Sequence, residues 1–161
     1  FAYLYEDVRP DIVIVGKALS GGFYPVSGIL ADSNILDVFK PGEHGSTFGG
    51  NPLAAAVAIA ALDVIVDEKL PERSADLGKY FLEQIKAINS PHFKEVRGSG
   101  LWIGLVLDTL ARPYTEALKN AGLLCKETHE NTIRFAPPLT ITKEEIDWAV
   151  EKIKTVFLEN A

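Results

Sequence analysis

The segment that most constrains the fold is a run of four apolar β-branched residues, Ile12 to Val15, which ends at Gly16. A short apolar run bounded by glycine is typical of a strand that is buried on both faces, as in a parallel sheet. Lys17 follows directly, at the carboxyl end of the strand, which is the edge of an open α/β sheet where ligands bind. The run therefore predicts a sheet with a lysine at its ligand-binding edge.

Lys17 has two possible interpretations. A lysine pressed against an apolar sheet end is partly desolvated, which favours the neutral amine that attacks carbonyl groups, as a Schiff-base lysine must. Most lysines at strand ends instead extend an aliphatic stem to water. A phosphate-binding P-loop is a poor match, because its first glycine would fall at Asp11 and its serine or threonine at Ala18.

A second candidate site is the glycine-rich polar loop Glu43 to Gly50, which carries Ser46 and Thr47. The loop leads into Asn51 and Pro52, a helix cap followed by proline at the first helical position. Hydroxyl and amide donors close to a helix start suit a phosphate group. An ordinary flexible surface loop is the alternative for this segment.

Helices and strands alternate at short range in the rest of the chain. The helix 52–67 is apolar on nearly every face, which predicts that it is largely buried. Apolar spacing predicts further helices from about Leu70, Pro113 and Thr142, the last with a capping box. The expected strands are 23–31, 101–107, 123–125 and 132–135. From about Leu70 onward this pattern is typical of a compact α+β unit.

Arg134 is the third candidate, because it is the one arginine in the apolar strand 132–135. The planar fork of a guanidinium group suits a carboxylate, and Arg134 is followed by Phe135-Ala136-Pro137-Pro138. A structural ion pair with an acidic residue of the same chain is the alternative.

The composition excludes several function classes. The chain has 161 residues, 47% of them hydrophobic, and a formal net charge of −6 without a block of basic residues, which argues against a nucleic-acid surface. Cys125 is the only cysteine, and His44, His92 and His129 lack metal-ligand spacing, so neither a disulfide framework nor a metal site is expected. No stretch is long and apolar enough for a membrane span. Small molecules or other proteins are the expected partners.

Three motifs follow one another in a specific order: 11–22 (DIVIVGKALSGG), 42–52 (GEHGSTFGGNP) and 133–139 (IRFAPPL). Together they closely resemble the C-terminal part of the ornithine aminotransferases, which are class III, fold-type I enzymes that use pyridoxal 5′-phosphate. The resemblance covers all 161 residues with similar spacing. Within the class, the segments 19–27 and 134–136 look more like ornithine than acetylornithine aminotransferases.

The resemblance implies an α/β fold with two parts. Residues 1–68 would be the end of the large cofactor-binding domain, with its mainly parallel sheet and helices, and residues 69–161 the small α+β domain. The chain contains no methionine and is expected to be cut from something longer. Family groups that contact the pyridine nitrogen and stack on the cofactor ring lie upstream of Phe1, so these residues alone are expected to be inactive.

The resemblance also assigns roles to individual residues. Lys17 matches the lysine that binds the cofactor covalently and later moves the substrate proton. Thr47 matches the threonine that reaches the cofactor phosphate of the neighbouring subunit, with Ser46 beside it. Arg134 matches the arginine that binds a substrate carboxylate, notably in the glutamate/2-oxoglutarate half-reaction.

The implied reaction transfers the δ-amino group of L-ornithine to 2-oxoglutarate, which gives glutamate 5-semialdehyde and glutamate. The implied assembly is a homodimer with shared active sites, in the cytoplasm or, in a eukaryote, the mitochondrial matrix. One alternative is an acetylornithine or other ω-amino acid aminotransferase. Another is an inactive stand-alone fragment that acts as a dimerisation module.

Overall fold

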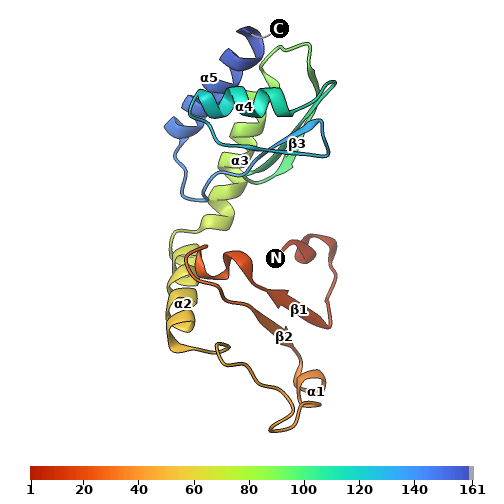
Figure 1. Ribbon diagram of the computed structural model, residues 1–161, viewed down its shortest axis with the longest axis vertical. Coiled ribbons are helices and arrows are strands. Elements are labelled where there is room, and N and C mark those ends of the chain that lie inside the picture. Colours follow the sequence, from red (N-terminus) through yellow and green to blue (C-terminus); the bar gives the residue numbers. More distant parts are fainter. Residues whose placement is uncertain (160–161) are drawn as a thin grey trace. The chain divides into compact units, whose positions relative to one another are not determined.

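A computed structural model describes residues 1–159 of the chain. The chain divides into two compact units, Phe1–Glu68 and Lys69–Ala161, and each unit is described by itself (Figure 1). No helix among the described residues is long and apolar enough to cross a membrane. The assignment of the first unit to a larger cofactor-binding domain stays a prediction.

The first unit is built around a two-stranded antiparallel sheet, β1 (Ile12–Val15) and β2 (Gly28–Ala31). A 3₁₀ helix, η2 (Lys17–Ser20), lies between the two strands in the chain and packs against the long helix α2 (Pro52–Asp67). The remaining elements are two short helices, η1 (Ala2–Glu6) and α1 (Ser33–Leu36).

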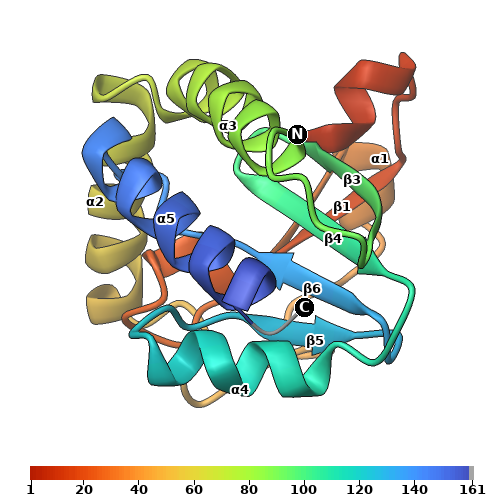
Figure 2. The ribbon, with the colours of Figure 1, turned by 90° about the horizontal axis from the view of Figure 1, so that it is seen from above.

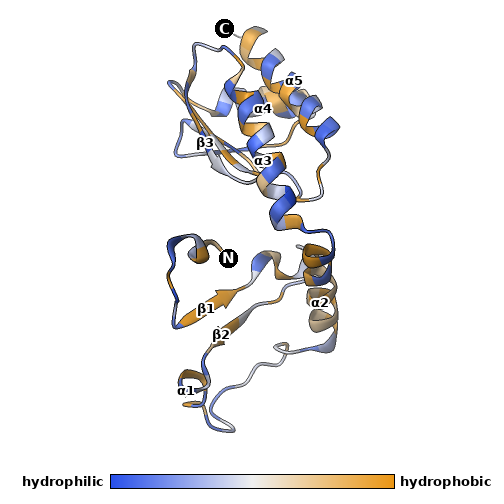
Figure 3. Cartoon of the chain, turned by 180° about the vertical axis from the view of Figure 1, so that it is seen from behind, coloured by the Kyte–Doolittle hydropathy of each residue, from blue (hydrophilic) through white to orange (hydrophobic). Residues whose placement is uncertain are grey.

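Burial in the first unit differs from the sequence-based expectation. The side chain of Ile14 in β1 is 81% exposed, and only Ala54 and Ala58 of α2 are buried. Figure 3 shows that β1 and β2 are nonetheless strongly hydrophobic. The expected parallel pairing of β1 does not occur among residues 1–159, where every strand pair is antiparallel. The side chains of β1 and α2 stay exposed because a two-stranded sheet and a single long helix are too few elements to bury both faces of the sheet and all sides of the helix.

The start of α2 follows the sequence prediction. The side-chain oxygen of Asn51 accepts a hydrogen bond from the backbone N–H of Ala54 at 2.9 Å, and Pro52 occupies the first helical position. Because this cap satisfies one of the free N–H groups of the first turn, the helix begins at a defined residue directly after the glycine-rich loop.

The second unit contains a four-stranded antiparallel sheet with the order β3-β4-β6-β5 (Figure 2). Its strands are β3 (Phe93–Ser99), β4 (Trp102–Leu107), β5 (Lys126–Thr128) and β6 (Thr132–Phe135), and its helices are α3 (Leu70–Lys86), α4 (Arg112–Asn120) and α5 (Lys143–Glu159). The strand expected at 123–125 lies slightly later in the chain, at β5.

The core of the second unit joins one face of this sheet to the three helices. Alternate strand residues point into it, which leaves the intervening residues on the open face. The helices predicted from apolar spacing are present, and each contributes buried apolar residues to this core. The buried residues of this core are Phe81, Ile85, Ile88, Leu101, Ile103, Leu105, Leu107, Ala111, Leu118, Ile133, Phe135, Ile146, Val150, Ile153, Val156 and Phe157.

Local chemistry marks two helix boundaries in the second unit, and the predicted capping box is confirmed. Gly122 ends the segment after α4 with a φ of 92°, which a residue with a side chain rarely adopts. In the capping box before α5, the Thr142 backbone N–H donates to Glu145 at 2.8 Å, and the Glu145 N–H donates to the Thr142 hydroxyl at 3.2 Å. These reciprocal bonds fix the start of the last helix.

Helix α3 and the β3–β4 turn approach each other at the level of the backbone. A Cβ atom on Gly78 would overlap the carbonyl group of Gly100, and a Cβ on Gly100 would lie 2.6 Å from the Ser74 hydroxyl. That hydroxyl accepts a hydrogen bond from the backbone N–H of Leu101 at 3.1 Å. Only glycine at position 78 therefore lets the helix sit this close to the turn.

We expect Gly78→Ala to lower the free energy of unfolding by about 1–3 kcal/mol, because the added methyl group forces the helix away from the turn. The matched control is Gly104→Ala in β4, where a Cβ would make ordinary contact with Thr132 at 3.6 Å. Urea denaturation of both variants measures the difference. A gain of about 1 kcal/mol in Gly78→Ala, as helix propensity alone predicts, would contradict the close approach.

Candidate active site

Lys17 lines a hollow of about 830 Å³ in the first unit. The hollow lies between the segment that follows β1, the entry to β2 and the loop before α2. Ser46 belongs to its lining, and Thr47 does not. The remaining lining residues are Tyr24, Pro25, Val26, Ser27, Phe48, Gly49, Gly50, Asn51 and Ala54. The structure thus brings together two of the predicted residues, one from each of the first two motifs.

The backbone of Lys17 has an unusual conformation. Its φ is 52°, in the left-handed region that residues with side chains rarely adopt, at a cost of about 1 kcal/mol or more. Its side chain is exposed and makes no hydrogen bond or ion pair with the described residues. Of the two interpretations of this lysine, the exposed side chain matches the one in which it reaches water and not the one in which it is pressed against an apolar sheet end. The reason is that the apolar strand before it is itself uncovered in this unit.

Ser20 holds the turn behind Lys17, a role that the sequence analysis missed. Its side chain is only 2% exposed, and its hydroxyl donates to the carbonyl oxygen of Tyr24. The same hydroxyl accepts from the Tyr24 backbone N–H at 3.0 Å. A single serine therefore pairs both backbone groups of Tyr24, which lines the hollow. A serine beside paired glycines is the signal that could have indicated it.

The second predicted motif forms a tight turn at the start of α2. The Ser46 hydroxyl accepts a hydrogen bond from the backbone N–H of Gly49 at 2.9 Å, so this side chain shapes the loop as well as lining the hollow. Thr47 is exposed. Gly50 has a φ of 71°, which explains why glycine stands directly before the Asn51 cap.

Arg134 lies in β6 of the second unit, on the open face of the sheet. Its guanidinium carbon lies 5.4 Å from the centre of the Trp102 ring, a cation–π contact. It makes no ion pair with the described residues, so the structural ion pair kept open as an alternative is not observed there. Together with Trp102 it lines a hollow of about 410 Å³. The structure thus presents a half-buried arginine without a carboxylate partner among residues 69–159.

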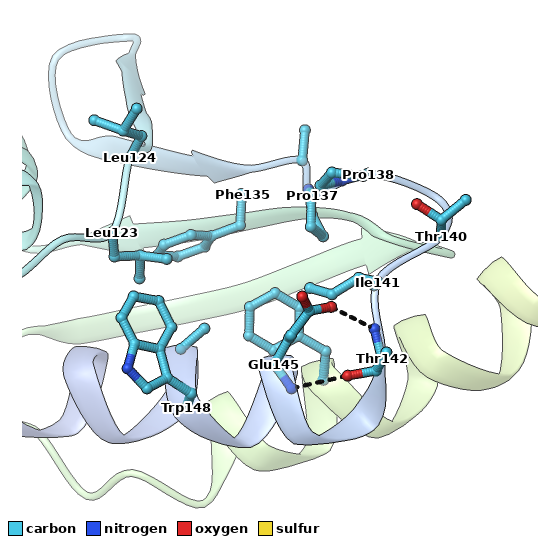
Figure 4. A pocket seen from close by; sticks show the side chains of 13 residues that line it. Leu123, Leu124, Phe135, Pro137, Pro138, Thr140, Ile141, Thr142, Glu145 and Trp148 are labelled. Carbon is cyan, nitrogen blue, oxygen red and sulfur yellow. Dashed lines mark hydrogen bonds between the residues drawn. The ribbon is translucent and has the colours of Figure 1, made fainter. Parts of the chain in front are cut away.

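A further hollow in the second unit, of about 690 Å³, is mainly apolar (Figure 4). Leu123 and Phe135 lie across it from Trp148 of α5 (Figure 4). Its one acidic side chain, Glu145, is engaged in the capping box with Thr142. No side chain in the described lining is left to do chemistry, so this hollow is not a candidate catalytic site.

Comparison with known proteins places these motifs in one family. Residues 1–157 match the family described as Aminotransferase class-III. The chain belongs to the class III aminotransferases. The resemblance inferred from the sequence, and with it the α/β fold class, is confirmed. Every predicted site residue lies within the matched range, while the roles of these residues stay predictions.

Two curated class III relatives are similar over 157 residues, which is 98% of this chain. Identity is 66% to ornithine aminotransferase 2 of Staphylococcus aureus (strain Mu50) and 64% to the ornithine aminotransferase of Geobacillus sp. (strain WCH70). The matched segment covers 40% and 39% of these proteins, respectively. The chain therefore spans about two fifths of the length of these relatives.

Solved class III structures share the fold closely. The acetylornithine aminotransferase from Elizabethkingia anophelis matches with a TM-score of 0.93 and 52% identity, over 99% of this chain and 43% of that one. The ornithine aminotransferase from Plasmodium yoelii matches with a TM-score of 0.92 and 42% identity, over 100% and 44%. A Toxoplasma gondii ornithine aminotransferase, with a TM-score of 0.92, 42% identity and coverage of 99% and 39%, is described with partial occupancy of PLP at its active site.

We expect Ser20→Ala to lower the free energy of unfolding by about 1–3 kcal/mol, because it removes both hydrogen bonds to Tyr24 and leaves half-buried backbone groups unpaired. The exposed Ser27, which lines the same hollow, provides the control as Ser27→Ala and should change stability by less than about 0.5 kcal/mol. Urea denaturation measures both variants. Equal losses in the two would show that the Ser20 turn does not stabilise the site.

Proposed function

We propose that this chain is part of a pyridoxal 5′-phosphate-dependent aminotransferase that transfers the δ-amino group of L-ornithine to 2-oxoglutarate, giving glutamate 5-semialdehyde and glutamate. The observation that carries the proposal is the Lys17 amine, which makes no hydrogen bond or ion pair with residues 1–159 and lines a hollow with Ser46. Identities of 64% and 66% to ornithine aminotransferases support the choice of substrate. Because those relatives are much longer, we propose that residues 1–161 alone are inactive.

The residues around the hollow fit this cofactor. Lys17 offers a primary amine to an aldehyde, and the hollow of about 830 Å³ is in the range of small-molecule sites. The Ser46 hydroxyl and the start of the 16-residue helix α2 offer donors to a phosphate. When bound, the cofactor would supply the aldehyde and an electron-withdrawing ring.

The residues of this chain would then have separate tasks. Lys17 would hold the cofactor through its Nζ atom, and the same amine, once the substrate amine has displaced it, would accept the proton of the amino-bearing carbon. Arg134 would bind the carboxylate of the acceptor through its planar fork. Its lack of a carboxylate partner among the described residues of the second unit supports this role.

We also propose a homodimer, as the family resemblance implies. Thr47 is exposed and does not line the hollow that contains Lys17. This position supports a role at the cofactor phosphate of the neighbouring subunit, rather than at the hollow in its own chain. The proposed location is the cytoplasm, or the mitochondrial matrix in a eukaryotic cell.

An acetylornithine or other ω-amino acid aminotransferase is the second candidate. The observation that favours it is the 52% identity to the Elizabethkingia anophelis acetylornithine aminotransferase, which exceeds the 42% identity to the Plasmodium yoelii ornithine enzyme. The higher identities to the bacterial ornithine aminotransferases give the ornithine reaction preference.

In the complete protein, we expect Lys17→Ala to abolish transamination, with a loss of at least about a thousandfold, because no other amine lines the hollow among the described residues. Borohydride reduction followed by peptide mapping should place the cofactor on the peptide that contains Lys17 in the wild type, and on no peptide in the variant. Lys40→Ala, another exposed lysine of the first unit, is the control. Retained turnover in Lys17→Ala would refute the proposed role.

The choice of donor is tested by rates on L-ornithine and N-acetylornithine with 2-oxoglutarate as acceptor. We expect kcat/KM to be at least about tenfold higher for ornithine, because an acetyl group removes the charge of the α-amino group and adds bulk. A preference for N-acetylornithine would replace the ornithine assignment with the second candidate, while leaving the cofactor proposal intact.

A further inference from the structure

We propose that Arg97 is a second carboxylate-binding residue beside Arg134, and that the two guanidinium groups together bind the carboxylate-bearing amino acceptor. This inference rests on the proposed function, in which Arg134 binds that acceptor. The juxtaposition that carries it is a row of residues across the open face of the second unit's sheet: Arg97 in β3, Gly104 in β4 and Arg134 in β6.

The strand register places these three residues side by side. Arg97 pairs with Gly104, and Gly104 in turn pairs with Arg134. Residues directly opposite each other in neighbouring strands point to the same face of a sheet. Since Ile133 and Phe135 are buried on the other face, Arg134 and Arg97 share the open face.

Glycine at position 104 leaves room between the two arginines. The backbones of Arg97 and Arg134 are separated by two interstrand spacings, which is about 10 Å. Two arginine side chains are long enough to reach a small molecule bound between them. Both arginines line the same hollow of about 410 Å³, with Trp102, Thr132 and His129. None of the described residues that line this hollow is acidic.

The charge of Arg97 is available for a ligand. Its contact with Glu95 is a 3.4 Å ion pair between side chains that are 63% and 51% exposed, and such surface pairs contribute little. Arg134 stacks over Trp102, which leaves the edge of its guanidinium group free for hydrogen bonds. Two guanidinium groups at one hollow, one held only by an exposed ion pair and the other only by an aromatic ring, favour an anion, and their planar forks suit a carboxylate.

Lys126 provides a matched control, because it belongs to the same row and pairs with Arg134 from β5. It does not line the hollow, and its ammonium group lies 3.2 Å from Glu127. A hydrogen bond from Arg112 lowers the pKa of Glu127 to about 2, so this carboxylate is ionised at neutral pH and offsets the lysine charge. Loss of either cation changes the net charge equally, but only Arg97 borders the hollow.

The test uses the complete protein and the inert dicarboxylate glutarate. Calorimetry gives the Kd of glutarate for the wild type, Arg97→Gln, Arg97→Lys and Lys126→Gln, and steady-state kinetics give KM for 2-oxoglutarate and for the amino donor. We expect Arg97→Gln to weaken glutarate binding about tenfold or more and to raise KM for 2-oxoglutarate in parallel, with little change in kcat or donor KM. Arg97→Lys should recover part of the loss, and Lys126→Gln should stay within about twofold of the wild type.

Three results would overturn the assignment of Arg97. The first is glutarate binding in Arg97→Gln within about twofold of the wild type, and the second is an equal loss in Lys126→Gln, which would indicate a general charge effect. The third is a lower urea midpoint in both Arg97 variants without a change in glutarate affinity, which would indicate a structural role. A wild type that binds glutarate but does not transaminate would overturn the proposed function, and its Arg97 variants would still test this site.

Discussion

The alternation of side chains along β6 decides what the second unit can present to a ligand. Ile133 and Phe135 are fully or nearly buried against the helices, so Arg134 between them has to lie on the opposite face. A shift of one residue in register would bury the guanidinium group and expose both apolar side chains. The burial that stabilises the core therefore also fixes the position of the arginine, which has no carboxylate partner in the described part of the chain.

The second unit could be predicted from its sequence because the sheet and helices that bury its apolar residues all belong to this unit. The helical stripe through Phe81 and Ile85 and the later one through Ile153 pack together on one face of the sheet. Thr142 and Glu145 signal the start of the last helix by local chemistry alone. Pattern, capping and packing point to the same structure, which is when reasoning from sequence works best.

The first unit shows where such reasoning stops. The apolar runs of β1 and α2 predict that these elements are buried. The unit contains too few other elements to cover them, so Ile14 is largely exposed. The strand and the position of Lys17 behind it were still predictable, since both depend on local sequence. Ser20 and Arg97 were missed for another reason. Their importance depends on a backbone turn and on pairing across three strands, and neither leaves a periodic signal in the chain.

The contact between Gly78 and Gly100 has a mechanical consequence. A contact made by two backbones contains no rotamers, so helix α3 and the β3–β4 hairpin cannot slide past each other by small side-chain adjustments. Arg97 is anchored three residues before Gly100, on the same stiff hairpin. The guanidinium group of Arg97 can therefore change position through side-chain rotamers. Strand β3, which carries it, moves only together with helix α3.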